Sequence, residues 1–389
     1  MRRPYCYYFL LFSHFIFTFG SAQNLSFNSL PSPALESVST PNYFESDLAF
    51  ETGIAKLNRE TPIDLQYNSE VRTYIELFLG KRRSDMELSL TRAQYYFPIF
   101  EEVLDRYNLP LELKYIAVIE SGLNPFACSK SGAVGLWQFL YNTCSLFDLK
   151  VDSYIDERRD VYKSTEAACR YLQYLYLTFR DWNLVLAGYV GGPGEVRKAI
   201  ERSGGKTDYW EIRPYLAPQV KNYIPAFIAV DYLMNNYAMH GINLKPGEYP
   251  VKTDTLHITY AVYFEQITKV LDISIGELVK LNPVYRRHYI PQLQEPSVLV
   301  LPEPLITKYL REEKFIREVK IPEDNYSSLL ARAGDVSDKI KIFHTVQPGE
   351  YFHKIALRYN CTIENIKAWN GLSSMVIHPG QVLEIWVDE

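Results

Sequence analysis

Histidine is the residue type whose absence excludes most in this chain. The histidines lie at positions 14, 240, 257, 288, 344, 353 and 378, so the segment 97–237 contains none. Serine–histidine or cysteine–histidine nucleophilic catalysis and a metal held by histidine are therefore excluded from that segment. The cysteine spacings do not resemble those of a zinc site. We expect neither a metal nor another cofactor.

Extended runs of positive charge are also missing. The 389 residues carry a net charge of -5, and no long run of Lys or Arg interrupts them, which excludes the usual basis of nucleic-acid binding. With 47% apolar residues, the composition is that of a soluble globular protein. The length predicts two or three domains.

Long apolar runs are limited to the N-terminus. Arg2 and Arg3 precede an apolar run that ends in the small residues Gly20-Ser21-Ala22, the pattern of a secretory signal peptide over 1–22. The run is short for a membrane span and no second one follows. Because Cys6 precedes the run, it is badly placed for a lipid anchor. We expect export without a stable membrane anchor.

Cysteine is scarce after the signal. Only Cys128, Cys144, Cys169 and Cys361 remain. An exported protein can form disulfides, so a Cys128–Cys144 link and free buried thiols are both open.

An apolar helical stripe that ends on a carboxylate is the feature from which we infer chemistry. Within 109–143, Leu113, Ile116 and Ala117 recur at helical spacing, and the next position on that stripe is Glu120. Gly122 then ends the helix near a cleft. Burial disfavours an ionised carboxylate, so we expect Glu120 to have a raised pKa and to donate protons. The alternative is a helix-terminal Glu paired with Arg or Lys.

The motifs around Glu120 resemble a known family. They are Glu120-Ser121, Ser129, Gly132-Ala133, Gly135-Leu136-Trp137-Gln138-Phe139, Gly188-Tyr189 with three nearby glycines, and Asn222-Tyr223-Ile224-Pro225. This pattern resembles the soluble lytic transglycosylase domain, a relative of goose-type lysozyme. The lead-in at 61–83 is similar to that of the membrane-bound lytic murein transglycosylase D family. The resemblance covers most of 60–240 and, with the near absence of strand-like alternation, implies an all-α, lysozyme-like domain.

The resemblance implies cleavage of peptidoglycan between N-acetylmuramic acid and N-acetylglucosamine. Glu120 would be the catalytic acid, and the substrate's own C6 hydroxyl would close a 1,6-anhydro ring. Ser121, Gln138, Tyr189 and Tyr223 occupy family positions that contact the substrate, with a packing role as the alternative for each. Trp137 is expected in the core.

Three departures from the family pattern keep other functions open. Val190 stands where the family has Asn, Leu140-Tyr141 where it has Met-Pro, and Gln219 where it has Glu. Val190 favours a catalytically silent protein that only binds peptidoglycan. A hydrolytic lysozyme would need a second carboxylate, such as Asp156, facing the cleft. The charged run 156–160 that contains Asp156 is expected to be a solvated, self-paired surface.

Composition divides the rest of this multidomain chain. The Ser-, Pro- and Asn-rich segment 23–60 is expected to be a flexible arm, and 61–96 a helical brace on the catalytic domain 97–240. A strand–helix–helix–strand order over 250–303 resembles a degenerate LysM module, kept for its structure. The charged segment 304–341 is expected to be a linker.

The segment 342–387 resembles a full LysM repeat. The motifs are His344-Thr345-Val346, Pro348-Gly349-Glu350, Asn370-Gly371-Leu372 and Pro379-Gly380-Gln381. The resemblance implies binding of glycans that contain N-acetylglucosamine, with Gly349 and Asn370 as candidate contacts. The expected partner is therefore the peptidoglycan glycan strand, and the expected location is the periplasm or cell envelope of a Gram-negative bacterium. The oligomeric state is open.

Overall fold

The computed structural model describes residues 47–388, with gaps at 153, 245–246, 248, 250–251, 322–338, 348–349, 360, 371 and 373–375. The predicted signal peptide 1–22, residues 23–46 of the predicted arm and Gly349 lie outside the described residues. Among the residues within these ranges, no helix is both long enough and apolar enough to cross a membrane.

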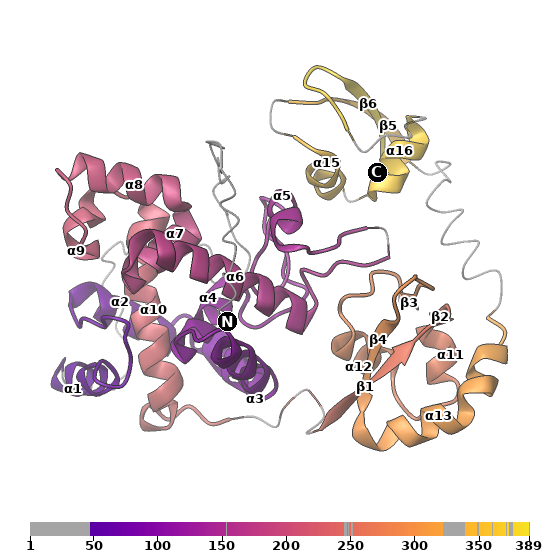
Figure 1. Ribbon diagram of the computed structural model, residues 1–389, viewed down its shortest axis with the longest axis horizontal. Helices are drawn as coiled ribbons and strands as arrows, with labels where there is room; N and C mark the ends of the chain where they lie inside the picture. Colours follow the sequence, from indigo (N-terminus) through magenta and orange to yellow (C-terminus); the bar gives the residue numbers. More distant parts are fainter. Residues whose placement is uncertain are drawn as a thin grey trace, which may run out of the picture.

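Residues 47–242 form a helical domain with one hydrophobic core, which contains buried side chains from Phe50 to Ile242 (Figure 1). Its α-helices are α1 (Asp47–Leu57), α2 (Ser69–Leu79), α3 (Arg83–Arg106), α4 (Tyr115–Ser121), α5 (Tyr141–Cys144), α6 (Val161–Phe179), α7 (Trp182–Gly191), α8 (Pro193–Arg202), α9 (Tyr209–Ile212) and α10 (Pro218–Asn236). The 3-10 helices are η1 (Leu111–Lys114), η2 (Ser145–Phe147), η3 (Arg213–Tyr215) and η4 (Tyr237–His240). The all-α fold expected for this part of the chain is confirmed.

The expected flexible arm is wrong for its last part, because α1 is a packed helix. Phe50 and Ile54, one helical turn apart, are buried, and the ring of Phe50 meets that of Tyr232 on α10 edge to face at 5.7 Å. The Ser- and Pro-rich composition of the preceding residues concealed this short amphipathic stretch.

The predicted boundary between brace and catalytic domain at 96–97 is also wrong, since it falls inside α3. Tyr96 and Phe100 are both fully buried on this helix, in the same core as the residues around Glu120. Helix α2 packs against α10. The brace is therefore part of the domain that it was expected to support.

A second, smaller body follows. Its elements are β1 (Thr253–Ile258), β2 (Val262–Tyr263), α11 (Phe264–Thr268), α12 (Ile275–Leu281), β3 (Tyr289–Ile290), β4 (Ser297–Pro302) and α13 (Glu303–Glu318). Strands β1 and β4 pair antiparallel, with Thr253 opposite Pro302, and β2 pairs with β3. The expected strand–helix–helix–strand order is present, with a short extra strand pair.

The linker expected over 304–341 is wrong in its first part, where α13 packs on β1 and β4. Tyr309 and Ile316, seven positions apart and therefore on one helix face, are buried in the core of this module. The many charged residues lie on the other faces of the helix and give the segment the composition of a linker. Residues 322–338 of the predicted linker are not described.

The C-terminal LysM fold consists of β5 (Lys339–Thr345), α15 (Phe352–Arg358), α16 (Ile363–Trp369) and β6 (Val382–Asp388). Strands β5 and β6 pair antiparallel, with Thr345 opposite Val382. Ile355, Ile366, Leu383 and Ile385 fill its small core.

Candidate active site

Glu120 is buried near the C-terminal end of helix α4. Every residue of α4 is buried, and the helix ends where Gly122 adopts the left-handed conformation (φ 57°, ψ 33°) that glycine tolerates best. Leu113 and Ile116 are 0% exposed and Glu120 is 6% exposed, as the apolar stripe predicted. A carboxyl group therefore occupies a position with core-like burial.

Two buried tyrosines from other helices lie in the electrostatic field of Glu120. Tyr189 is on α7 and Tyr223 on α10. Burial first, and then the negative charge of Glu120, raises the pKa of both phenols well above the ordinary value. The Tyr189 hydroxyl donates to the carbonyl oxygen of Trp137 at 2.8 Å. The Tyr223 hydroxyl is buried against the Glu120 carboxyl group, and a hydrogen bond between the two, of irregular geometry, adds to the rise in the pKa of this phenol.

The loop 127–139 lies beside this group and is held by side chains next to it. Ser121 Oγ donates to the carbonyl oxygens of Ala117 and Leu136, each at 2.9 Å, and so ties the end of α4 to the loop. Gln138 has a positive φ of 52°, and its Nε2 donates to the carbonyl oxygens of Ala127 and Gly135. The loop is therefore closed by hydrogen bonds to its own backbone.

Trp137 is a buried residue of this loop that ties it to helix α6. It is 1% exposed, and its indole nitrogen donates to Thr165 Oγ1 on α6 at 2.9 Å. Its predicted place in the core is confirmed.

The predicted substrate contacts fall into two groups. The structure brings Tyr189 and Tyr223 to Glu120, whereas the hydroxyl of Ser121 and the amide nitrogen of Gln138 are engaged by backbone. In the LysM domain, Asn370 donates to the carbonyl oxygens of Ile366 and Glu384 and accepts from the Glu384 N–H. These hydrogen bonds give Asn370 a structural role in the module, and its glycan contact stays a prediction.

The charged run 156–160 is not the solvated surface that its composition predicted. Arg158 is 0% exposed and Asp156 1%. The guanidinium holds both carboxylate oxygens, at 2.8 Å from Nε and 2.7 Å from Nη2. Burial alone would raise the pKa of Asp156, but the hydrogen bonds and charge of Arg158 lower it overall. Self-pairing was predicted correctly, but burial depends on tertiary neighbours.

Burial of this pair also removes Asp156 as a candidate for the second carboxylate that a water-using enzyme would need. Both oxygens of Asp156 face Arg158, so neither is available to activate water.

The cysteines near the site are structural thiols. Cys128, Cys144 and Cys169 are not joined by disulfides. Burial raises the pKa of Cys144 and of Cys169 to about 12, so neither is a nucleophile at neutral pH. Within the described ranges, no cluster of His, Cys, Asp and Glu is arranged to hold a metal ion.

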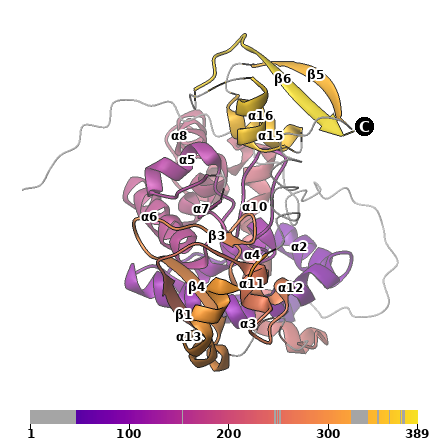
Figure 2. The ribbon, with the colours of Figure 1, turned by 90° about the vertical axis from the view of Figure 1, so that its right-hand side faces the viewer.

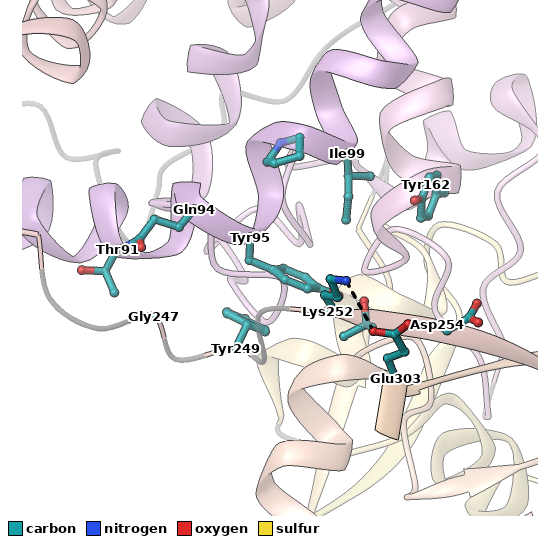
Figure 3. A pocket seen from close by; sticks show the side chains of 12 residues that line it. Thr91, Gln94, Tyr95, Ile99, Tyr162, Gly247, Tyr249, Lys252, Asp254 and Glu303 are labelled. Carbon is teal, nitrogen blue, oxygen red and sulfur yellow. Dashed lines mark ion pairs between the residues drawn. The ribbon is translucent and has the colours of Figure 1, made fainter. Parts of the chain in front are cut away.

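A hollow of about 760 Å³ lies elsewhere, between α3 and the first LysM-type module (Figure 3). Its lining residues are Thr91, Gln94, Tyr95, Pro98, Ile99, Tyr162, Gly247, Tyr249, Lys252, Thr253, Asp254 and Glu303. None of them belongs to the stretch 109–143. The hollow is therefore separate from the group around Glu120.

Each domain matches a known family. Residues 98–212 match the Transglycosylase SLT domain, and residues 344–386 match the LysM domain. Residues 252–315 match the family described as Lytic transglycosylase MltD, LysM-like domain.

Similar proteins were found both by sequence and by structure. Membrane-bound lytic murein transglycosylase D of Escherichia coli (strain K12) is 27% identical over 335 residues, which span 85% of this chain and 72% of the relative. The 70 kDa soluble lytic transglycosylase of Escherichia coli aligns with a TM-score of 0.34 and 20% identity, over 55% of this chain and 39% of that one. The lytic transglycosylase Slt of Pseudomonas aeruginosa aligns with a TM-score of 0.32 and 17% identity, over 45% and 31%.

The sequence relative and the family matches agree along the chain. The SLT match covers the helices that carry Glu120 and Tyr189, and the two LysM-type matches cover the two smaller bodies. This protein is an MltD-like lytic transglycosylase with LysM domains.

Proposed function

We propose that this chain cleaves the β-1,4 bond between N-acetylmuramic acid and N-acetylglucosamine in peptidoglycan, with Glu120 as its only acid and base. The observation that carries the proposal is the burial of Glu120 at the end of α4, facing the phenols of Tyr189 and Tyr223. Burial favours the neutral carboxyl group over the carboxylate, and a neutral carboxyl group is the form that donates a proton.

The reaction needs one carboxyl group and no water. The Glu120 proton passes to the glycosidic oxygen, the bond from C1 of the muramoyl residue to that oxygen breaks, and N-acetylglucosamine leaves with a free hydroxyl. The muramoyl C6 hydroxyl then bonds to C1 and gives its proton to the Glu120 carboxylate. The product carries a 1,6-anhydro end, and Glu120 is protonated again for the next cycle.

Tyr223 is the best candidate for a group that holds Glu120 during this cycle. Its buried hydroxyl already lies against Glu120 and can donate to the carboxylate when Glu120 has lost its proton. Tyr189 and Ser121 act on the site indirectly, because their hydroxyls donate to the carbonyl oxygens of Trp137 and Leu136 and so position the loop. Gln138 keeps its side-chain oxygen for a sugar substituent, while its nitrogen closes the loop.

The LysM domain at 342–387 would hold the glycan, with peptidoglycan strands as the partner. The relative in Escherichia coli is named as membrane-bound, and the sequence of 1–22 has the pattern of a signal peptide. We therefore place the protein in the envelope of a Gram-negative bacterium.

A silent glycan-binding protein is the second candidate, and Val190 is the feature that favours it. This side chain stands where the family has Asn, and it packs against the main hydrophobic core. The substitution removes a polar group, although the carboxyl group of Glu120 is retained.

Incubation of the full-length protein with purified peptidoglycan, followed by mass spectrometry of the released fragments, separates the candidates. We expect muropeptides with 1,6-anhydro ends. Reducing ends would indicate hydrolysis, and intact sacculi would indicate the silent protein.

Glu120→Gln is the matched variant, because glutamine keeps the shape of the side chain but cannot donate the proton. It should bind sacculi as the wild type does and release nothing. Cleavage by this variant would move the acid to another residue.

A further inference from the structure

The C-terminal LysM domain contacts the helical domain next to the loop that flanks Glu120. The ring of Tyr141, at the start of α5, stacks on the rings of Tyr351 and His353, with centroid separations of 5.6 and 5.3 Å. Both views place α15 on the side of the LysM domain that faces the helical domain (Figures 1 and 2). The two domains therefore meet through an aromatic stack.

Tyr141 belongs to one of the departures from the family pattern, in which Leu140-Tyr141 replaces Met-Pro. A proline at 141 would have no aromatic ring to place against Tyr351 and His353. The departure is thus explained by the domain contact and not by the chemistry at Glu120.

Arg158 connects this contact to the loop 127–139. Its Nη2 lies 3.0 Å from Nε2 of His353, and its Nη1 donates to the carbonyl oxygens of Gly132 and Phe139 at 3.1 and 3.4 Å. A side-chain atom at Gly135 (φ +89°) would lie 1.9 Å from the Arg158 carbonyl oxygen, so the loop is pressed against this residue.

The opposite side of the loop reaches the catalytic group. The carbonyl oxygen of Leu136 accepts from Ser121 and that of Trp137 accepts from Tyr189, two residues whose neighbour is Glu120. The hydrogen-bonded path from His353 to the site therefore passes through Arg158 and one short loop.

The residues just before Arg158 in the chain also contact the first LysM-type module. The N–H of Asp156 donates to the carbonyl oxygen of Val284 at 2.9 Å, and that of Arg286 donates to the carbonyl oxygen of Tyr154 at 2.8 Å. Arg158 therefore lies where all three bodies of the protein meet, with its charge balanced by Asp156.

We propose that Arg158 is a positioning residue that couples the docked LysM domain to the geometry of the loop 127–139, so that docking supports catalysis by Glu120. This inference rests on the proposed function. It gives the LysM domain a second task besides glycan binding, because its contact with Tyr141 and Arg158 fixes the loop that orients Ser121 and Tyr189.

The test compares full-length variants that weaken docking without touching the catalytic group. Tyr141→Ala and His353→Ala should lower kcat on uncrosslinked glycan strands by about three- to tenfold, within the range found for coupling between sites, and leave KM nearly unchanged. The double variant should be no worse than the stronger single variant, since both remove one contact. Arg158→Lys, which keeps the charge but loses the planar fork, should lower kcat by the same order.

Matched controls separate docking from general damage. Tyr141→Phe keeps the stack and should retain wild-type kcat. His353→Gln keeps an acceptor for Arg158 but loses the ring that stacks on Tyr141, so its kcat should lie between those of the wild type and His353→Ala. Phe343→Ala removes a 68% exposed ring of the LysM domain on β5, outside the contact with Tyr141 and Arg158, and should also leave kcat unchanged. A rise in KM alone would mean that the LysM domain only tethers glycan. A rise in kcat would mean that the docked domain inhibits. Either result overturns the proposal.

Hydrogen exchange provides a readout that does not depend on activity. The N–H groups of Val134 and Gly135 donate to the carbonyl oxygens of Phe139 and Ala127 inside the loop. These amides should exchange faster in Tyr141→Ala than in Tyr141→Phe, because undocking loosens the loop. Equal exchange rates in the two variants would overturn the coupling. If the wild type released no anhydro products, that separate result would count against the proposed function alone.

Discussion

Nη2 of Arg158 and Nε2 of His353 lie 3.0 Å apart, although 195 positions separate the two residues in the chain. A guanidinium group only donates hydrogen bonds, so Nε2 is the acceptor and the proton of the neutral ring lies on Nδ1. Burial first, and then the positive charge of Arg158, lowers the pKa of His353 from 6.5 to about 3. The docked position of the LysM domain therefore requires a neutral imidazole.

Acidification should release the LysM domain from the helical domain. Above pH 6.5 the ring is neutral in both positions, but below that value only the undocked ring gains a proton, so docking weakens as the pH falls toward 3. Arg158, Arg159 and Arg286 repel that proton in the docked position, and Asp156 attracts it. The docking equilibrium should shift by about tenfold for each pH unit below 6.5. Fluorescence energy transfer between dyes on the two domains measures it.

His353→Gln is the control for this prediction. Its side-chain oxygen accepts from Arg158, but the amide does not titrate, so the transfer efficiency of this variant should stay constant between pH 7.5 and about 4.5. An equal loss of transfer in wild type and variant would assign the acid response to another group.

The helical core and Glu120 could be predicted from sequence, because both depend on local periodicity. Buried positions recur along each helix at three- and four-residue spacing, and Glu120 occupies one of them in α4. Strand β4 was predictable for a similar reason, since its buried positions alternate, whereas the C-terminal module was recognised from its LysM motifs.

The burial of Arg158 could not be predicted in this way. Its partners Gly132, Phe139 and His353 come from two other parts of the chain, and neighbouring opposite charges usually indicate surface. Helices α1 and α13 were missed for a different reason. Each has only two buried side chains within a stretch of charged or small residues. These are Phe50 and Ile54 on α1, and Tyr309 and Ile316 on α13.

Removal of the Tyr223 hydroxyl should separate activity from stability. In Tyr223→Phe, the buried hydroxyl that faces Glu120 is lost, and because its hydrogen bond to that group lacks regular geometry, the free energy of unfolding should change little. The value of kcat should fall by about tenfold or more, because a hydrogen bond to a charged group contributes roughly 1.5–3 kcal/mol. Release of anhydro muropeptides and thermal unfolding are the two measurements.

Tyr189→Phe is the matched control. Its hydroxyl donates to the carbonyl oxygen of Trp137, so this variant should lose about 1 kcal/mol of stability. If Tyr223→Phe were destabilised as much as Tyr189→Phe while its kcat stayed at the wild-type level, Tyr223 would have a packing role only.

The LysM-type modules should depend on one asparagine each. Asn282 donates to the carbonyl oxygens of Leu278 and Val300 and accepts from the Val300 N–H, and Asn370 makes the same three bonds in its own module. Replacement of either residue by Asp keeps the shape but places an oxygen against two carbonyl oxygens. Each variant should lose about 1–3 kcal/mol of stability in its own module.

Glycan binding decides between this structural role and a direct sugar contact for Asn370. Binding of Asn370→Asp to sacculi should be normal at temperatures where the module remains folded. Lost binding by a fully folded variant would restore the direct contact.

A buried carboxyl group on α10 should make the protein less stable as the pH rises. Asp231 is 1% exposed, one of its oxygens has no hydrogen-bond partner, and burial followed by the charge of Glu112 raises its pKa from 3.8 to about 7. Between these pH values the folded protein holds a proton that the unfolded chain has lost, so stability falls as the pH rises through this window. Asp231→Asn, which carries no charge, should therefore be more stable than the wild type at pH 8.

The pH dependence of that difference identifies its cause. The gain from Asp231→Asn should be on the order of a few kcal/mol at pH 8 and should shrink toward pH 4, close to the unfolded-state pKa of 3.8, where the two states differ little in bound protons. Glu201→Gln, on the exposed surface of α8, should show no such dependence. A gain that stayed constant from pH 4 to pH 8 would mean that the amide packs better than the carboxyl group. Burial of a charge would then not be what destabilises α10.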